Sequence, residues 1–219
     1  MFGSARIIGR GRVGSAVAAR LHERGVELRE NDAELVLLCV PDTAISDVAA
    51  SIDRGPWVAH TSGATSLAAL APHRARFSVH PLQTFTAGRG AEQLDGAWAA
   101  ATGESDAARG HARELARTLG LEPFDLADGD RVLYHAGAAL VSSYVVTLYR
   151  AARLLFETVG APPEGLVPLL RRTIDNDFQM TGPIVRGDHA TIEAHLRELA
   201  VRTPELAPLY RALAGASTP

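Results

Sequence analysis

The sequence predicts an α/β fold, with a mostly parallel sheet in the first part of the chain and an all-helical C-terminal part. Up to residue 126, short apolar runs alternate with stretches of helical composition, as in parallel strands joined by helices. From residue 127 onward the pattern is helical throughout. We therefore expect two domains, residues 1–126 and residues 127–219.

Composition and charge are those of a globular protein. The 219 residues are 47% hydrophobic and 21% charged, and the net charge is −3. No basic stretch would attract nucleic acid or an anionic membrane, and no uninterrupted apolar run approaches the roughly 20 residues that span a bilayer. The single cysteine, Cys39, excludes an intrachain disulfide. We expect a cytoplasmic protein with no nucleic-acid or membrane partner.

A glycine-rich loop near the N-terminus is the main functional motif. The run Arg6-Ile7-Ile8 leads into Gly9-Arg10-Gly11-Arg12-Val13-Gly14, and a helical stretch then continues to about Arg24 and ends at Gly25. Between a strand and a helix, such glycines allow a tight turn, close approach of a pyrophosphate and close helix packing. The helix N-terminus adds free N–H groups and partial positive charge. The motif predicts a Rossmann-like dinucleotide site in which all six loop residues bind the cofactor.

The segment after this helix is too short for a complete Rossmann half. Val26–Leu28 is a candidate second strand, but the next apolar run begins at Leu35, whereas a parallel crossover needs about a dozen residues. Either Leu35–Val40 pairs differently or the first half is shortened. The nominal ligands of a cofactor ribose are Glu27, Glu30 and Glu34, with Arg29 for a ribose phosphate; the alternative is that all four are solvated charges.

Polar residues follow three of the predicted strands. The strand Leu35–Val40 ends in Pro41-Asp42, where Asp42 is a candidate N-cap for a helix over residues 43–52. Because the carboxyl ends of parallel strands form the ligand crevice of α/β proteins, we add Val40, Pro41 and Ser62 to the cofactor site.

The strands Trp57–His60 and Phe77–His80 both end in histidine followed by hydroxyl and amide residues. Their position makes His60, Ser62, His80 and Gln83 candidates for a functional site. Capping and turn hydrogen bonds are the alternative role for each of them.

The alternation of strands and helices stops after a strand at Ala97–Thr102, a helix at Asp106–Leu119 and a short strand at residues 122–126. One long helix, Asp130–Val159, is then predicted, apolar around most of its girth. Shorter helices follow at Glu164–Ile174, at His189–Val201 with Asp188 as N-cap, and after Pro204. The long helix must be covered by neighbours or by a second subunit, so we expect a homodimer formed through the C-terminal helices.

All 22 basic residues are arginine, and the chain has no lysine. Proton transfer near neutral pH must therefore come from histidine, a perturbed carboxyl group, tyrosine or Cys39, because arginine stays protonated. His135, early in the long helix, is the best placed proton donor. We expect it to face Ser62 and His80, and we predict these three residues to be catalytic; the alternative is a packed histidine bonded to a backbone carbonyl.

Six stretches together resemble one family: Gly9-x-Gly11-x-x-Gly14, Leu38-Cys39-Val40-Pro41-Asp42, His60-Thr61-Ser62-Gly63, His80-Pro81-Leu82-Gln83-Thr84-Phe85, Tyr134-His135-Ala136 and Thr181-Gly182-Pro183-Ile184-Val185-Arg186-Gly187-Asp188. The chain resembles two-domain Rossmann proteins related to the phosphogluconate-dehydrogenase superfamily, specifically the bacterial group with a helical C-terminal domain of unknown function. The resemblance implies an NAD(P)-dependent oxidoreductase that dimerises through its helices. Related dehydrogenases often use a lysine or asparagine on the long helix, and neither occurs here; Ser143 lies near the expected asparagine.

Three functions follow from these features. The first is hydride transfer between NADP or NAD and an unidentified small molecule. The second is a degenerate Rossmann protein that binds a ligand or partner without redox catalysis, which the shortened first half favours. The third is a metal-dependent hydrolase, which the spacing of the histidines disfavours, and no residue is predicted to bind metal.

Overall fold

The computed structural model describes residues 2–183 and 185–217, which form two compact units that divide between Val141 and Ser142. The first unit contains the described strands and helices up to α4 (Arg131–Val141), and the second contains helices α5 to α8. The boundary predicted at residues 126/127 lies one residue after the last strand, β7 (Glu122–Asp125). The compact units divide later because side chains of α4 bond to residues of the sheet unit.

The first unit is built on a seven-stranded sheet with the order β2-β1-β3-β4-β5-β6-β7. All neighbouring pairs are parallel except β5 with β6. This architecture confirms the predicted α/β fold with a mostly parallel sheet. The strands are β1 Ser4–Ile8, β2 Glu27–Leu28, β3 Leu35–Leu38, β4 Trp57–His60, β5 Arg76–Leu82, β6 Trp98–Gly103 and β7 Glu122–Asp125.

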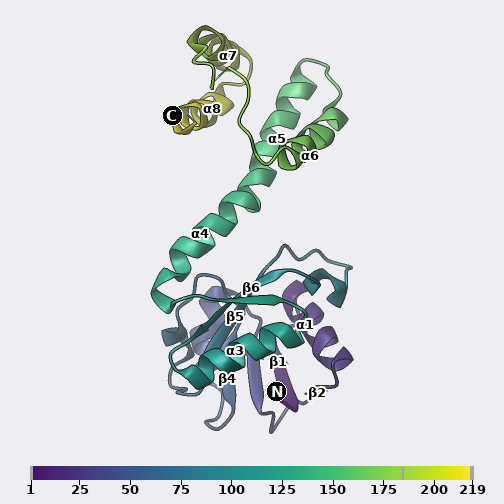
Figure 1. Ribbon diagram of the computed structural model, residues 1–219, viewed down its shortest axis with the longest axis vertical. Helices are drawn as coiled ribbons and strands as arrows, with labels where there is room; N and C mark the ends of the chain where they lie inside the picture. Colours follow the sequence, from purple (N-terminus) through teal and green to yellow (C-terminus); the bar gives the residue numbers. More distant parts are fainter. Residues whose placement is uncertain (1, 184, 218–219) are drawn as a thin grey trace. The chain divides into compact units, whose positions relative to one another are not determined.

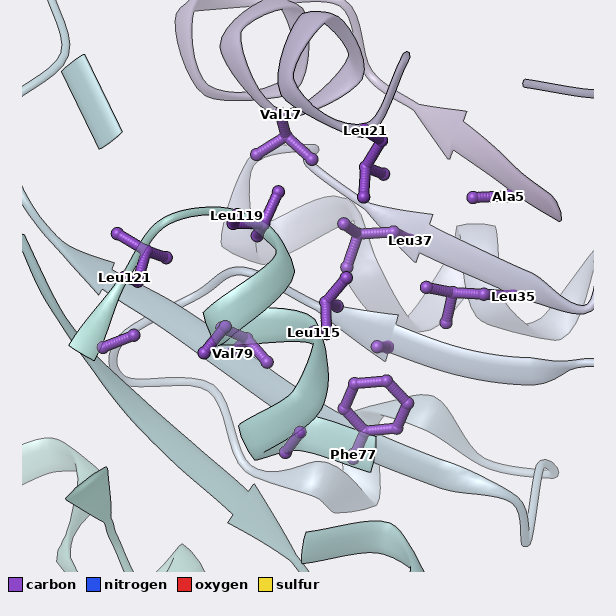
Figure 2. Close-up of a cluster of buried hydrophobic side chains, with 14 of the residues drawn as sticks. Ala5, Val17, Leu21, Leu35, Leu37, Phe77, Val79, Leu115, Leu119 and Leu121 are labelled. Atoms are coloured by element: carbon purple, nitrogen blue, oxygen red, sulfur yellow. The ribbon is translucent and has the colours of Figure 1, made fainter. Parts of the chain in front are cut away.

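Helices cover both faces of this sheet. On one face, α1 (Arg12–Glu23) and α3 (Asp106–Thr118) pack against the strands through a continuous apolar core, shown in Figure 2. On the other face, α2 (Ile45–Ala50) and the short 3₁₀ helix Leu67–Leu70 bury a smaller cluster. Each fully buried leucine or phenylalanine contributes about 1.5–3 kcal/mol, so both clusters stabilise the packing of helices on the sheet.

The first Rossmann half is shortened, and the strand register shows how. β2 has two residues, which pair with Ser4 and Ala5 at the start of β1, and Ala5 also pairs with Leu35 at the start of β3. The chain at Leu28 is therefore already level with the start of β3. Residues 29–34 therefore only have to cross the amino end of β1 to reach β3 on its other side. No helix is needed to return the chain to the start of the next strand (Figure 1).

This register rules out the nominal ribose ligands. Glu27 pairs with Ser4, and the Glu34 carboxylate accepts a hydrogen bond of 2.8 Å from the Gly3 N–H, so both lie at the amino end of β1. The glycine loop follows the opposite end of the same strand. Arg29 forms an ion pair of 2.5 Å with Glu27. The ribose roles considered for these residues are therefore wrong. β2 ends level with the amino end of β1, whereas the glycine loop follows the carboxyl end of β1.

The predicted helix over residues 43–52 forms as a 3₁₀ helix, Asp42–Ala44, followed by α2. Asp42 does not cap it: the residue before α2 is Ala44, and the Asp42 carboxylate accepts a hydrogen bond from the Ser62 hydroxyl instead. The expectation of an Asp42 N-cap is wrong because the neighbouring strand end offers a better donor.

The second unit consists of α5 (Ser143–Thr158), α6 (Leu166–Asp175), α7 (His189–Arg202) and α8 (Ala207–Ala216). Asp188 caps α7 as predicted, accepting hydrogen bonds from the N–H and hydroxyl of Thr191. The long helix predicted over Asp130–Val159 forms as α4 and α5, with Ser142 between them in a non-helical conformation.

One helical stretch of the described chain, Asp128–Thr158, is long and apolar enough to cross a membrane by length and composition alone. Polar residues interrupt the apolar sequence of this stretch. A search for uninterrupted apolar runs therefore does not detect it as a candidate membrane span. Arg131, near its start, is fully buried and bonds to residues of the sheet unit. We therefore interpret the beginning of this stretch as a helix that packs against the sheet unit.

Candidate functional site

The loop between β1 and α1 has the close contacts that its glycines predict. Gly9 has a φ of +95°, and a Cβ there would lie 2.5 Å from the carbonyl oxygen of Cys39. A Cβ on Gly14 would lie 1.8 Å from the carbonyl oxygen of Gly9. At Gly11 a Cβ would meet no described atom within 4 Å. Gly9 and Gly14 are therefore required for packing, whereas Gly11 leaves an open surface over the loop.

The N-terminus of α1 is suited to an anion. Gly11 is its N-cap, no described side chain caps it, and its first turn contains no acidic residue. Arg10 and Arg12 are exposed beside it, and Arg12 donates to the carbonyl oxygen of Phe85 at 3.3 Å. Free N–H groups, the helix dipole and two guanidinium groups together favour a phosphate at this position.

The strand register aligns the other predicted site residues along the same sheet edge. Ile8 pairs with Leu38, Leu38 with His60, and His60 with Ser78. The residues that follow these positions therefore share the edge with the glycine loop. Val40 lies close to Gly9, since a Cβ on that glycine would be 3.1 Å from Val40 Cγ1, and Pro41 is exposed.

Ser62 is the centre of a hydrogen-bond network after β4. Its hydroxyl bonds to the Asp42 carboxylate at 2.8 Å and to the Thr65 hydroxyl at 2.9 Å, and it accepts from the N–H groups of Ala64 and Thr65. The hydroxyl is thus occupied in shaping the loop. A catalytic role for Ser62 stays a prediction.

A buried arginine, Arg131, holds this loop from α4. Its guanidinium donates to the carbonyl oxygens of Ser62 and Thr65 and, at 2.9 Å, to the hydroxyl of Thr102 on β6. The side chain is fully buried, and the Asp128 carboxylate lies 3.9 Å from it. Charge-assisted bonds of this kind are the strong ones, so Arg131 fixes the Ser62 loop against the sheet and α4.

Two histidines beside Arg131 are held neutral. Burial lowers the pKa of His60 to about 3, and the nearby Arg131 charge adds to the effect. Burial, then His135 and Arg131, lower the pKa of His80 to about 4. His60 is fully buried, its Nδ1 accepts from the Ser62 N–H at 3.2 Å, and its Nε2 has no partner among the described atoms.

His80 connects the sheet to α4 through a tyrosine. Its Nδ1 lies 2.8 Å from the hydroxyl oxygen of Tyr134, whose pKa burial raises to about 12. The His135 ring lies 5.8 Å from that of His80, and a Cβ on Gly63 would be 2.4 Å from His135 Cδ2 and 2.8 Å from His80 Nε2. His135 is exposed rather than sealed in a core. The structure thus brings together His80, Tyr134, His135 and the Ser62 loop.

The lowered pKa values predict a pH dependence of stability. Between about pH 6.5 and pH 4 the histidines of the unfolded chain take up protons while folded His60 and His80 do not, so the free energy of unfolding falls as pH falls through this range. Urea denaturation near pH 7 and near pH 5 measures the difference. It should shrink in His80→Gln and not in His22→Gln, which alters an exposed histidine of α1. Equal pH dependence in wild type and His80→Gln would contradict this assignment.

Other candidates are not part of this group. Gln83 bonds to the Gln93 carbonyl oxygen and the Thr84 N–H, which is a turn role. Burial raises the pKa of Cys39 to about 12, so its thiol is unsuited to proton transfer. Among residues 2–183 and 185–217, no three His, Cys, Asp or Glu side chains are grouped so that they could hold a metal ion.

Sequence reasoning missed two residues of the site, Arg131 and Tyr134. The sequence signal that could have identified Tyr134 is its place beside His135 in the motif Tyr134-His135-Ala136. For Arg131 no local pattern distinguishes a buried arginine from a solvated one.

The fold and the glycine loop define a Rossmann-like α/β protein with an added helical unit. Residues 97–217 match the model of a family described as "Domain of unknown function (DUF2520)", and this match spans more than half of the chain. The chain belongs to this family. No curated protein matches it.

Solved structures share this fold over nearly the full length. A "putative NADP oxidoreductase" from Bacteroides fragilis has 21% identity and a TM-score of 0.81, covering 98% of this chain and 97% of its own. A protein from Thermotoga maritima has 22% identity and a TM-score of 0.72, covering 97% and 98%. A reductive aminase from Aspergillus terreus, in complex with NADPH and ethyl levulinate, has 16% identity and a TM-score of 0.67, covering 99% and 93%. At these identities the likeness establishes the fold alone.

Proposed function

We propose that the protein is an NAD(P)-dependent oxidoreductase that transfers hydride between the cofactor and a small molecule. The observation that supports this most is the open, uncapped N-terminus of α1, which lies on the same sheet edge as the His80–Tyr134 pair. Such a reaction needs a site for the phosphates of the cofactor and a group that carries a proton near the substrate. Both lie at the carboxyl ends of the strands. Two proteins of similar fold support the proposal: one described as an NADP oxidoreductase and a reductive aminase that binds NADPH.

The residues of the glycine loop fit the pyrophosphate of such a cofactor. The N–H groups at the start of α1 would bind it, Gly11 would leave room for it, and Arg10 and Arg12 would add positive charge. Val40, Pro41 and the Ser62 loop would border the rest of the cofactor. When bound, NADP or NAD supplies the hydride.

The proton for a reduced carbonyl or imine would come from His135, and Tyr134 would position the reacting group. Burial raises the pKa of Tyr134 to about 12, so its hydroxyl stays protonated and acts as a hydrogen-bonding group, bonded to the neutral His80. His135 is exposed beside them. Ser62 and Arg131 would position this group by fixing the loop after β4.

A ligand-binding protein without redox activity is the second candidate, because of the short β2. The carboxylate that usually binds the cofactor ribose follows the second strand, and here that strand ends at the amino edge of the sheet. A site of this kind would hold phosphates but would bind the adenosine half weakly.

Titration of the protein with NADPH and NADH, followed by cofactor fluorescence, distinguishes the two functions. The oxidoreductase requires that at least one of them bind at micromolar to millimolar concentration. If neither binds, the oxidoreductase is excluded and the ligand-binding function is favoured.

We further propose a homodimer formed through the second unit. Eight large apolar side chains of α5 and α6 are 38–61% exposed, namely Tyr144, Val146, Leu148, Leu154, Val167, Leu169, Leu170 and Ile174. Monomers rarely expose so many apolar side chains on adjoining helices. We expect the protein to act in the cytoplasm, without a nucleic-acid or membrane partner.

Sedimentation at micromolar concentration should show a dimer, and Leu169→Asp should shift it toward monomer, because Leu169 is 61% exposed and its removal does not disturb a core. Arg171→Gln, at an exposed polar position of the same helix, should leave the dimer intact. A wild-type monomer at this concentration would contradict the proposal.

A further inference from the structure

Large apolar side chains lie exposed on the strands next to the His80–Tyr134 pair. We use the name aromatic shelf for Leu82, Trp98, Phe124 and Tyr134. Trp98 is 56% exposed and Leu82 is 39% exposed, although both belong to strands of the sheet. Phe124 and Tyr134 beside them are half-buried. Contiguous exposed apolar side chains mark binding surfaces.

The rings of the aromatic shelf form an unbroken row that ends at the polar group. Ring centroids are 6.3 Å apart for Trp98 and Phe124, 5.8 Å for Phe124 and Tyr134, and 5.5 Å for Tyr134 and His80. The last two contacts are edge-to-face, a favourable geometry for aromatic pairs. His135 extends the row, 5.8 Å from His80.

Strand register explains why the strand residues of the shelf share one face. Trp98 pairs with Leu82, and Ala100, two residues further on, pairs with both His80 and Phe124. Side chains two apart along a strand point to the same face, so this face has Trp98 and Ala100 on β6 beside Leu82 and His80 on β5. Because the side chain of Ala100 is small, the rings of His80 and Phe124 on either side of it form the surface of this face.

The two ends of the row differ in chemistry. At one end, the Tyr134 hydroxyl and the rings of His80 and His135 offer hydrogen-bonding groups. At the other end, Trp98 and Leu82 are apolar, and Glu122, the β7 register partner of Trp98, is exposed and disfavours an anion there. This pattern fits a molecule with a carbonyl or imine group at one end and an uncharged aromatic or bulky apolar group at the other.

We propose that the aromatic shelf binds the aromatic or bulky apolar part of the substrate, and so selects aryl-substituted carbonyl or imine compounds. The proposal rests on the proposed oxidoreductase function, with the reacting group beside Tyr134 and His80. Stacking on Trp98 and exclusion of water from Leu82 would supply the selectivity.

Saturation-transfer NMR with phenylacetone and butanone as probes tests this. Phenylacetone should bind the full-length protein, with or without NADPH, and butanone should bind at least about tenfold more weakly. Trp98→Ala should weaken phenylacetone binding by about tenfold or more while NADPH binding stays unchanged. Because Trp98 is more than half exposed, this truncation should not disturb folding.

Trp57→Phe is the control, because Trp57 packs against Phe77 and His111 in the apolar core beneath α1 and α3, away from the aromatic shelf, and its replacement should not affect phenylacetone binding. Equal binding of the two ketones, or unchanged phenylacetone binding in Trp98→Ala, would overturn the proposal. So would a dimer that dissociates in Trp98→Ala, since the aromatic shelf would then be a contact between two copies. Phenylacetone binding that persists in Gly11→Asp supports the aromatic shelf separately from the cofactor site.

Discussion

Gly11→Asp should weaken NADPH or NADH binding by at least about a hundredfold while the protein stays folded. Two like charges about 4 Å apart near a protein surface repel by roughly 4 kcal/mol, and the new carboxylate would lie where the pyrophosphate binds. The fold should tolerate it, because a Cβ at Gly11 meets nothing within 4 Å and the φ of −72° suits any residue. Aspartate is moreover a favoured N-cap, so α1 should be no less stable.

Cofactor fluorescence titration measures this effect, and Gly110→Asp provides the control. Gly110 is an exposed glycine of α3 whose added Cβ also meets nothing within 4 Å. It adds the same charge away from the glycine loop and should leave cofactor affinity unchanged. Wild-type affinity in Gly11→Asp would show that the cofactor does not bind at the N-terminus of α1.

Arg131→Met should lower the free energy of unfolding of the first unit by about 3 kcal/mol or more. The methionine fills a similar volume but donates no hydrogen bond, so the carbonyl oxygens of Ser62 and Thr65 and the Thr102 hydroxyl lose their donor in a buried site. A buried polar group without a partner costs about 1–3 kcal/mol. The Ser62 loop should also lose its fixed position against α4.

Urea denaturation followed by Trp57 fluorescence, in a Trp98→Phe background, reports on the first unit. Arg89→Met is the comparison, because Arg89 pairs with Glu92 while 60% exposed and such pairs contribute at most about 1 kcal/mol. If the two variants lose the same stability, Arg131 does not hold the loop as the hydrogen bonds indicate.

Much of the fold could be predicted from local patterns. The apolar run at Leu35 became β3, and Gly25 and Gly120, which follow α1 and α3, have the positive φ expected of glycines that end helices. The predicted strand at Ala97–Thr102 is β6 within one residue at each end. These elements follow from apolar periodicity and helix-ending glycines, which depend on few neighbours.

The site was predictable as far as it depends on strand ends. Ser62 and His80 lie on one sheet edge because parallel strands align their carboxyl ends, and His135 lies beside His80 as expected. Arg131 and Tyr134 were missed because their bonds join a helix to a sheet, and such contacts depend on tertiary packing. Asp42 was assigned as a cap for the same reason: its true partner, Ser62, is 20 residues away in sequence.

The two-residue β2 has a consequence for association between molecules. It pairs with Ser4 and Ala5, so no described strand pairs with Arg6, Ile7 or Ile8 on that side of β1. Unpaired backbone groups at a sheet edge can recruit a strand from another chain. Here the open edge is three residues long and includes a charged arginine, which leaves too little backbone for a stable intermolecular ladder. The shortened crossover thus leaves part of a strand unpaired without making it an aggregation site.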